Sequence, residues 1–259
     1  YATDNQVTRD KFAKFVETMD IDKNWPGIQG FGFSIPVKPE DKQSHIAAIR
    51  AEGFPDFTIK PEGEREMYSS IIYLEPFDWR NRRAFGYDMW SNEMRREAMT
   101  RSRNEGVAAT SGIITLVQET KENVQPGFLT YVPVYKTKNI PSNVEERIEQ
   151  FVGWIYAPYR AGNLMKGIIG SDDPNIEFEV FDGEDLDNEA MLFDSNDTPH
   201  LDDPDHNPDY AKIMKVENQG RVWTLYFNTP KGFLSSKDQK LPQFIALAGV
   251  FVNVLLFII

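Results

Sequence analysis

Cysteine is absent from this chain, and basic residues are outnumbered. Its 259 residues include 28 Lys and Arg against 40 Asp and Glu, which gives a formal net charge of -12 at pH 7. Without cysteine the chain has no disulfide, no cysteine nucleophile and no thiolate metal site. The acidic balance argues against a nucleic-acid-binding surface, because such a surface needs a basic stripe. We therefore expect no nucleic-acid partner.

Motifs of catalysis and cofactor binding are missing as well. His45, His200 and His206 lack metalloprotease spacing. There is no nucleophile elbow or phosphate-binding loop, and Gly30-Phe31-Gly32 lacks the third glycine of a dinucleotide fingerprint. The sequence predicts no catalytic residue, no cofactor and no enzyme. Carboxylate pairs are abundant at this charge, so an envelope hydrolase with converging acids is kept as an alternative.

Residues 171–210 contain fifteen Asp or Glu and neither Lys nor Arg. Asp182, Asp185 and Asp187 are closely spaced oxygen donors, which suggests a calcium site. The EF-hand pattern, with its glycine and its glutamate at position twelve, is absent. We interpret the stretch as solvated acidic loops, with a cation site as the alternative, and predict no metal ligands.

The last nineteen residues, 241–259, carry no charge. As a helix they would span about 28 Å, close to the hydrocarbon core of a bilayer. A buried helix of a soluble domain is the alternative, but such a helix normally keeps a polar face. We therefore expect the start of a transmembrane helix here. We also expect an earlier membrane helix upstream of Tyr1, with the residues between forming an extracytoplasmic domain.

The remaining residues predict two successive α+β units. With 41% hydrophobic residues the chain is of the globular class. Periodicity and turn signals predict helices over residues 5–20, after Pro39 and over 92–104, and strands over 30–35, 57–59, 68–74, 110–118 and 127–136. After a linker at 136–143, a second unit shows strand-like segments at 152–156, 176–182, 191–193, 209–216 and 220–227.

Several short motifs then occur in a fixed order: Trp25-Pro26-Gly27-Ile28 with Gly30-Phe31-Gly32, Tyr73-Leu74-Glu75-Pro76, Gly86-Tyr87-Asp88-Met89, Pro133-Val134-Tyr135, Glu145-Glu146-Arg147-Ile148 and Val180-Phe181-Asp182. These motifs in this order resemble the CHASE domain, the extracellular sensor module of cytokinin receptors and of many bacterial receptors. The similarity covers about residues 20–235.

The resemblance implies an α+β fold with antiparallel sheets and covering helices. Residues 1–22 would form a stalk helix, 23–140 a membrane-distal PAS-like unit, 141–240 a membrane-proximal PAS-like unit and 241–259 the membrane helix. It implies a periplasmic sensor domain of an inner-membrane receptor. A small ligand in the distal unit would signal through the membrane helix to a cytoplasmic output domain, such as a histidine kinase or a cyclic-dinucleotide enzyme.

The resemblance also places the ligand site. In cytokinin receptors an Asp near the start of the covering helix recognises the adenine ring, and Arg95 stands at that position here. A permanently charged donor favours a carboxylate or phosphate over a purine. The alternative is that Arg95 points to water and pairs with Glu93 or Glu97. The other candidate ligand-binding residues are Tyr131, Thr115, Trp90, Asp88, Ser111 and Val117.

Each of these candidates also has an ordinary structural interpretation. Tyr131 and Thr115 fit core or surface positions of a strand, Trp90 fits a lid or the core, and Asp88 fits a turn or a helix cap. The competing function is a dimerisation or protein-interaction module without a small ligand. In that case the chain's own aromatic side chains would fill the distal pocket. We expect a homodimer in either case.

Overall fold

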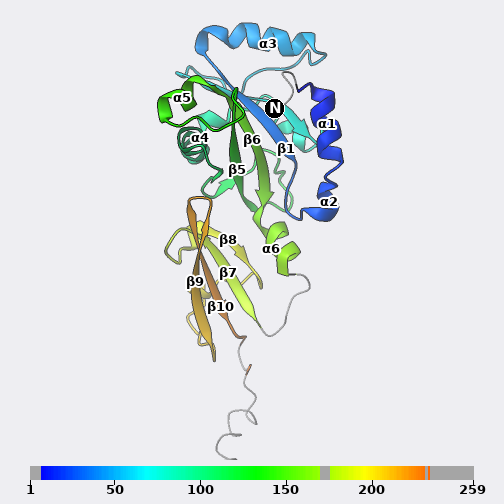
Figure 1. Cartoon of the computed structure of the whole chain (residues 1–259). Helices are drawn as coiled ribbons and strands as arrows, with labels where there is room; N and C mark the ends of the chain where they lie inside the picture. The colour runs from blue at the N-terminus through cyan, green and yellow to red at the C-terminus, as the bar shows by residue number, and fades with distance from the viewer. Residues whose placement is uncertain (1–6, 170–175, 231–232, 234–259) are drawn as a thin grey trace, which may run out of the picture.

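The computed structural model describes residues 7–169, 176–230 and Phe233. They form two stacked units (Figure 1). Both sheets are antiparallel and helices pack on them, which confirms the α+β class. The predicted membrane segment, 241–259, lies outside the described residues. Among those described, no helix has the length and apolar character that a membrane span requires.

The upper unit is built on a six-stranded sheet in the order β2-β1-β6-β5-β3, with β4 pairing to β5. Its strands are β1 (Phe31–Val37), β2 (Tyr68–Glu75), β3 (Ala109–Thr110), β4 (Ile114–Thr115), β5 (Pro126–Tyr135) and β6 (Phe151–Arg160). Its helices are α1 (Arg9–Glu17), α2 (Ile21–Asn24), α3 (Lys42–Ala51), α4 (Glu93–Glu105) and α5 (Val144–Glu149). Short 3-10 turns lie at η1 (Pro39–Asp41), η2 (Asn81–Arg83) and η3 (Met89–Ser91).

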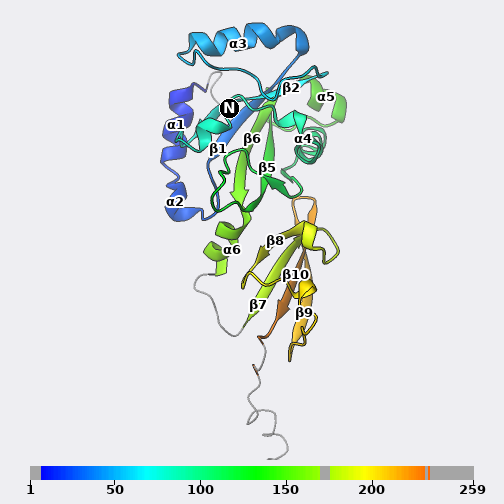
Figure 2. The same cartoon turned by 180° about the vertical axis from the view of Figure 1, so that it is seen from behind.

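The lower unit is a four-stranded sheet in the order β8-β7-β10-β9. It consists of β7 (Glu177–Asp182), β8 (Met191–Asp194), β9 (Ala211–Asn218) and β10 (Arg221–Asn228), with the turns η4 (Asn188–Ala190) and η5 (His200–Asp202). Helix α6 (Ala161–Ile169) lies at the junction of the units (Figure 2). The turn that joins β9 to β10 points toward the upper unit.

Strand β6 lies in the upper sheet, whereas its sequence pattern placed it in the second unit. It pairs with β5 from Gly127 opposite Arg160 to Tyr135 opposite Phe151, and with β1 on its other edge. Alternation of apolar and polar residues predicts a strand but not the sheet that accepts it. The domain boundary expected after residue 140 stays a prediction, and the upper sheet extends across it.

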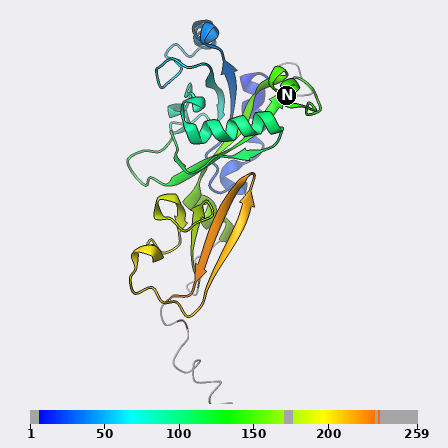
Figure 3. The same ribbon diagram turned by 90° about the vertical axis from the view of Figure 1, so that its left-hand side faces the viewer.

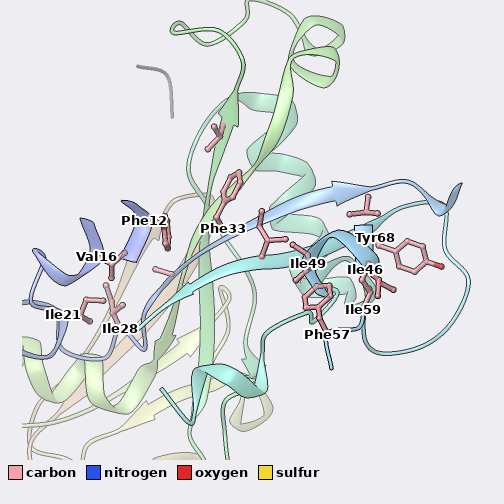
Figure 4. Close-up of a cluster of buried hydrophobic side chains, with 14 residues drawn as sticks. Phe12, Val16, Ile21, Ile28, Phe33, Ile46, Ile49, Phe57, Ile59 and Tyr68 are labelled. Atoms are coloured by element: carbon pink, nitrogen blue, oxygen red, sulfur yellow. The ribbon is translucent and has the colours of Figure 1, made fainter. Parts of the chain in front are cut away.

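Helices cover both faces of the upper sheet (Figures 1 and 3). Phe12 and Val16 of α1 enter a cluster of buried apolar side chains, where the Phe12 and Tyr73 rings lie 5.5 Å apart (Figure 4). The described part of the predicted stalk helix therefore belongs to the upper core. A second buried cluster lies under α4, between that helix and the sheet.

The two ends of the covering helix α4 are set by capping residues. Asn92 accepts a hydrogen bond from the Arg95 backbone N–H at 3.1 Å, and Gly106 ends the helix with a φ of 74°, where glycine is favoured. The Trp154 indole N–H donates to the Met99 carbonyl at 2.9 Å. This bond ties the middle of the helix to β6 and sets its position on the sheet.

Asp88 anchors the approach to α4. Its Oδ1 accepts hydrogen bonds from the backbone N–H groups of Ser69 (2.7 Å) and Trp90 (3.1 Å), and its Oδ2 lies 3.4 Å from the Arg65 Nε. The side chain is fully buried. Burial raises the pKa of Asp88, and the hydrogen bonds and Arg65 oppose this only in part.

A buried ion pair holds the loop after β4. Arg160, at the end of β6, donates to Glu119 through Nε at 2.7 Å, and to the Asn123 carbonyl. The two side chains are 5% and 3% exposed. Removing one partner of such a pair leaves the other charge buried without compensation.

We predict that Glu119→Ala lowers the free energy of unfolding by about 3–5 kcal/mol, because Arg160 then keeps a buried charge. The matched control is Glu105→Ala, which breaks the exposed pair of Arg101 and Glu105 and should cost about 0–1 kcal/mol. Urea unfolding of both variants measures the difference. Equal losses would contradict the assignment.

We predict a pH-dependent difference for Asp88→Asn. Because the pKa of Asp88 is raised in the native state, its stabilising contribution is present below the unfolded pKa and is lost as pH rises through the native pKa. The unfolding free energy of the variant minus that of the wild type should therefore increase from about pH 4 to about pH 7. Asp56→Asn, at an exposed carboxyl, is the control. A difference that is flat or decreasing would refute the prediction.

Candidate functional site

Arg95 is buried in the first turn of α4, with only 3% of its surface exposed. Its Nη2 donates to the Thr115 carbonyl at 3.3 Å, and its guanidinium lies 4.8 Å from the centre of the Tyr87 ring. Its Nε is buried and has no hydrogen-bond partner within the part of the chain that the structure describes. Among the described residues no carboxylate forms an ion pair with it. Arg95 therefore does not point to water, and does not pair with Glu93 or Glu97.

Two fully buried tyrosines lie close to this guanidinium. Tyr131 of β5 and Tyr156 of β6 have ring centres 6.2 Å apart. The Tyr131 hydroxyl donates to the Met89 sulfur at 3.5 Å, and the Tyr156 hydroxyl has no partner in the described ranges. Burial raises the pKa of both, and this outweighs the opposing effect of the Arg95 charge. Both hydroxyls therefore stay protonated and are available as donors.

Tyr156 is the residue that sequence reasoning missed. It belongs to β6, whose sheet was not predicted. The one available signal was Gly32 on the neighbouring strand β1. A Cβ at Gly32 would lie 2.3–2.5 Å from atoms of the Tyr156 ring, so only glycine leaves room for it.

We call Arg95, Tyr87, Met89, Tyr131 and Tyr156 the buried polar cluster. It combines a cation, two hydroxyl donors and a π face, and all its members are buried except Tyr87, which is half-buried. Buried donors normally have partners, and each exception in a folded protein requires an explanation. Chemically, the cluster is suited to a small anion: a carboxylate accepts two N–H bonds from a guanidinium in a fixed planar geometry.

The structure brings only part of the predicted site together. The Thr115 side chain is exposed, and it is the backbone carbonyl of this residue that contacts Arg95. Trp90 is half-buried, with its ring 5.9 Å from that of Trp154. Asp88 is engaged with Ser69 and Trp90, as described above.

The last two candidates hold backbone segments. Ser111 is buried, and its Oγ accepts a hydrogen bond from the Leu129 N–H at 3.0 Å, which fixes the chain beside β5. Val117 is half-buried, and its carbonyl accepts from Arg83 at 3.5 Å. Ligand contacts by Ser111, Val117, Thr115, Trp90 and Asp88 stay predictions.

Side chains occupy the space between α4 and the sheet. Trp154, Tyr131, Met89 and Met99 are fully buried there. Two of them are methionines, whose unbranched side chains change conformation readily. The interior is therefore closed in this structure, and a ligand beside Arg95 requires Met89 or its neighbours to move.

The lower unit contains a separate polar group. The buried Glu179 accepts from the His200 backbone N–H at 2.6 Å and contacts the His200 ring, and His206 Nε2 lies 2.7 Å from the Tyr226 hydroxyl. Glu179, His200 and His206 line a cavity of about 250 Å³. The hydrogen bonds of His200 and His206 hold the loop after β8 against the lower sheet.

Two of the three residues of the suggested calcium site, Asp182 and Asp187, bind groups of the chain itself, and Asp185 is exposed. Asp182 accepts from Arg221 and from the Ile113 N–H, and Asp187 caps η4 through the Glu189 N–H. Within the described ranges, no three His, Asp or Glu side chains are grouped so that they could hold a metal ion.

Comparison with known proteins agrees with the order of the motifs. A family model described as the CHASE domain matches residues 5–193, well over half of the chain. None of the curated proteins matches it. The matched region includes the whole upper sheet and the buried polar cluster, and ends within β8. CHASE domains are extracytoplasmic sensor domains of signalling receptors and are not catalytic. The resemblance carried by the motifs is confirmed: this chain belongs to the CHASE domain family.

Proposed function

We propose that this chain is the sensor domain of a transmembrane receptor and that it binds a small carboxylate in its upper unit, between α4 and the sheet. The observation that supports the ligand class most directly is the buried Arg95 guanidinium, which has no carboxylate partner among the described residues. The binding signal passes through the predicted membrane segment to a cytoplasmic output domain.

The unpaired charge of Arg95 carries an energetic cost in the ligand-free protein. Burying an ion without a counter-ion costs several kcal/mol, and a neutral apolar residue of the same size would avoid that cost. An anionic ligand supplies the missing partner. Its carboxylate would accept from Nε, which lacks a partner, and from an Nη of Arg95, and the Tyr156 hydroxyl is a further donor.

Size and polarity of the ligand follow from the surroundings. Within the cluster the Tyr87 ring faces the Arg95 guanidinium and the Tyr131 ring packs beside Tyr156, and Trp154 lies in the same buried core. A large or multiply charged ligand would need many of these rings to move. We therefore infer a small monoanion with a compact apolar body, admitted by displacement of Met89.

A second candidate function is a dimerisation or protein-interaction module without a small ligand. Two observations favour it. The interior beside Arg95 is filled by the protein's own aromatic side chains. In addition, Val107, Ile140, Val144 and Ile148 are 39–58% exposed around the end of α4 and on α5. An exposed apolar patch of this kind fits a protein partner or a second copy of the chain.

We predict that a carboxylate stabilises the full chain in a thermal-unfolding screen with separate sets of carboxylates, phosphates and purines. At a hundred times its dissociation constant, a ligand adds about 2.7 kcal/mol. Arg95→Met should abolish this response. Without ligand it should raise the free energy of unfolding by about 1–4 kcal/mol, because a buried unpaired charge is removed. Arg96→Met, one position along α4, is the matched control.

The alternatives give different results in the same screen. Stabilisation by a purine would keep the sensor role and refute the argument from Arg95. No response from any set would favour the interaction module. A large decrease in the free energy of unfolding of Arg95→Met would show that the guanidinium stabilises the fold and is not reserved for a ligand.

A further inference from the structure

The lower unit contacts the segment that borders the buried polar cluster. We call residues 109–117 the edge segment; it includes β3 and β4. Thr115 within it supplies the carbonyl that accepts from Arg95 at 3.3 Å. Ser111 within it is held to β5 by two hydrogen bonds with Leu129. The position of the edge segment therefore sets the surroundings of the Arg95 guanidinium.

Asp182, the last residue of β7, binds the edge segment through a hydrogen bond. Its Oδ2 accepts from the Ile113 backbone N–H at 2.7 Å. The same carboxylate takes two further hydrogen bonds from Arg221 of β10, with Nε at 3.0 Å and Nη2 at 2.6 Å. Asp182 is buried, so these bonds are shielded from water. Ile113 is only two residues from Thr115.

The turn between β9 and β10 makes a second contact. The Thr110 N–H donates to the Gln219 carbonyl at 3.1 Å, and the two side chains are hydrogen-bonded at 3.2 Å. Gly220, with a φ of 83°, lies directly against Arg101 of α4: a Cβ there would be 1.1 Å from an Arg101 nitrogen. Helix α4 and the edge segment therefore both contact the turn between β9 and β10.

Gly112 shows how little free space the junction has. A Cβ on Gly112 would lie 3.0 Å from the Met94 sulfur, 3.1 Å from Arg221 Nη2 and 3.2 Å from Asp182 Oδ2. Residues of α4, the edge segment, β7 and β10 meet at this point. Interiors packed this closely respond to a displacement by moving together or by switching between discrete arrangements.

From these contacts we infer that Asp182 and Arg221 are positioning residues of the ligand site in the other unit. They hold the edge segment so that the Thr115 carbonyl meets Arg95. A carboxylate on Arg95 competes with that carbonyl, releases the edge segment and shifts β7 and β10. This inference rests on the proposed function, and it assigns to the pair the coupling between ligand site and lower unit.

Backbone amide hydrogen exchange of the full, ligand-free chain tests the coupling. Asp182→Ala should accelerate exchange at 113–117 and in the first turn of α4 at least tenfold. Asp182→Asn keeps an oxygen acceptor for Ile113 and should restore part of the protection. Glu184→Ala, which breaks the exposed pair with Lys215 on the same sheet, should leave both regions unchanged. If Asp182→Ala fails to fold, Arg221→Met replaces it and should accelerate exchange in the same two regions.

Hydrogen exchange in the lower unit of the Arg95→Met variant distinguishes a positioning role of Asp182 from local stabilisation of its own sheet. Arg95→Met should change exchange at the β9–β10 turn and in β7, since coupling is reciprocal. Acceleration confined to β7 and β10 in Asp182→Ala, or an unchanged lower unit in Arg95→Met, would overturn the inference. Neither arm uses a ligand. If acetate and the other carboxylates fail to stabilise the chain while the exchange results hold, only the proposed ligand class is refuted.

Discussion

The carboxylate of Asp182 accepts hydrogen bonds from both units of this protein, and the position of the edge segment beside Arg95 depends on it. From the lower sheet it receives the Arg221 guanidinium, and from the upper unit the Ile113 N–H. A carboxylate has enough acceptor sites for these three bonds. Because Asp182 is buried, these bonds are shielded from water on the carboxylate side. The edge segment, and through it the carbonyl facing Arg95, therefore has a defined position relative to the lower sheet.

The buried cations of the chain differ in how they are compensated. Arg160 has Glu119, and the partly buried Arg221 has Asp182. Arg95 is as deeply buried as Arg160 but has one carbonyl and one aromatic face. A fold selected for stability alone would place a carboxylate or an apolar residue there. The unpaired cation is thus a local cost that the surrounding structure supports, which is the usual character of a functional site.

Features that depend on neighbours along the chain could be predicted from sequence. The helix from 92 to 104 follows from its residues and its terminal Gly106, and the turn at Asn218-Gln219-Gly220 follows from local turn chemistry. Features that depend on residues distant in the sequence could not be predicted in this way. The pattern of β6 does not specify its sheet, so Tyr156 was missed. Burial of Arg95 was no more predictable from α4, because Met94, Ala98 and Met99 are the only apolar residues of that helix and give little of an apolar stripe.

A sensor needs two conformations between which a ligand distinguishes, and the closed interior is consistent with one of them. In the closed form Arg95 uses the Thr115 carbonyl, and Met89 and the aromatic rings fill the remaining space. In a liganded form a carboxylate would take the place of that carbonyl. The exchange involves the same segment that Asp182 and the β9–β10 turn hold. Under the proposed function, ligand binding and the contact with the lower unit would share one structural element, and transmission would require no separate hinge.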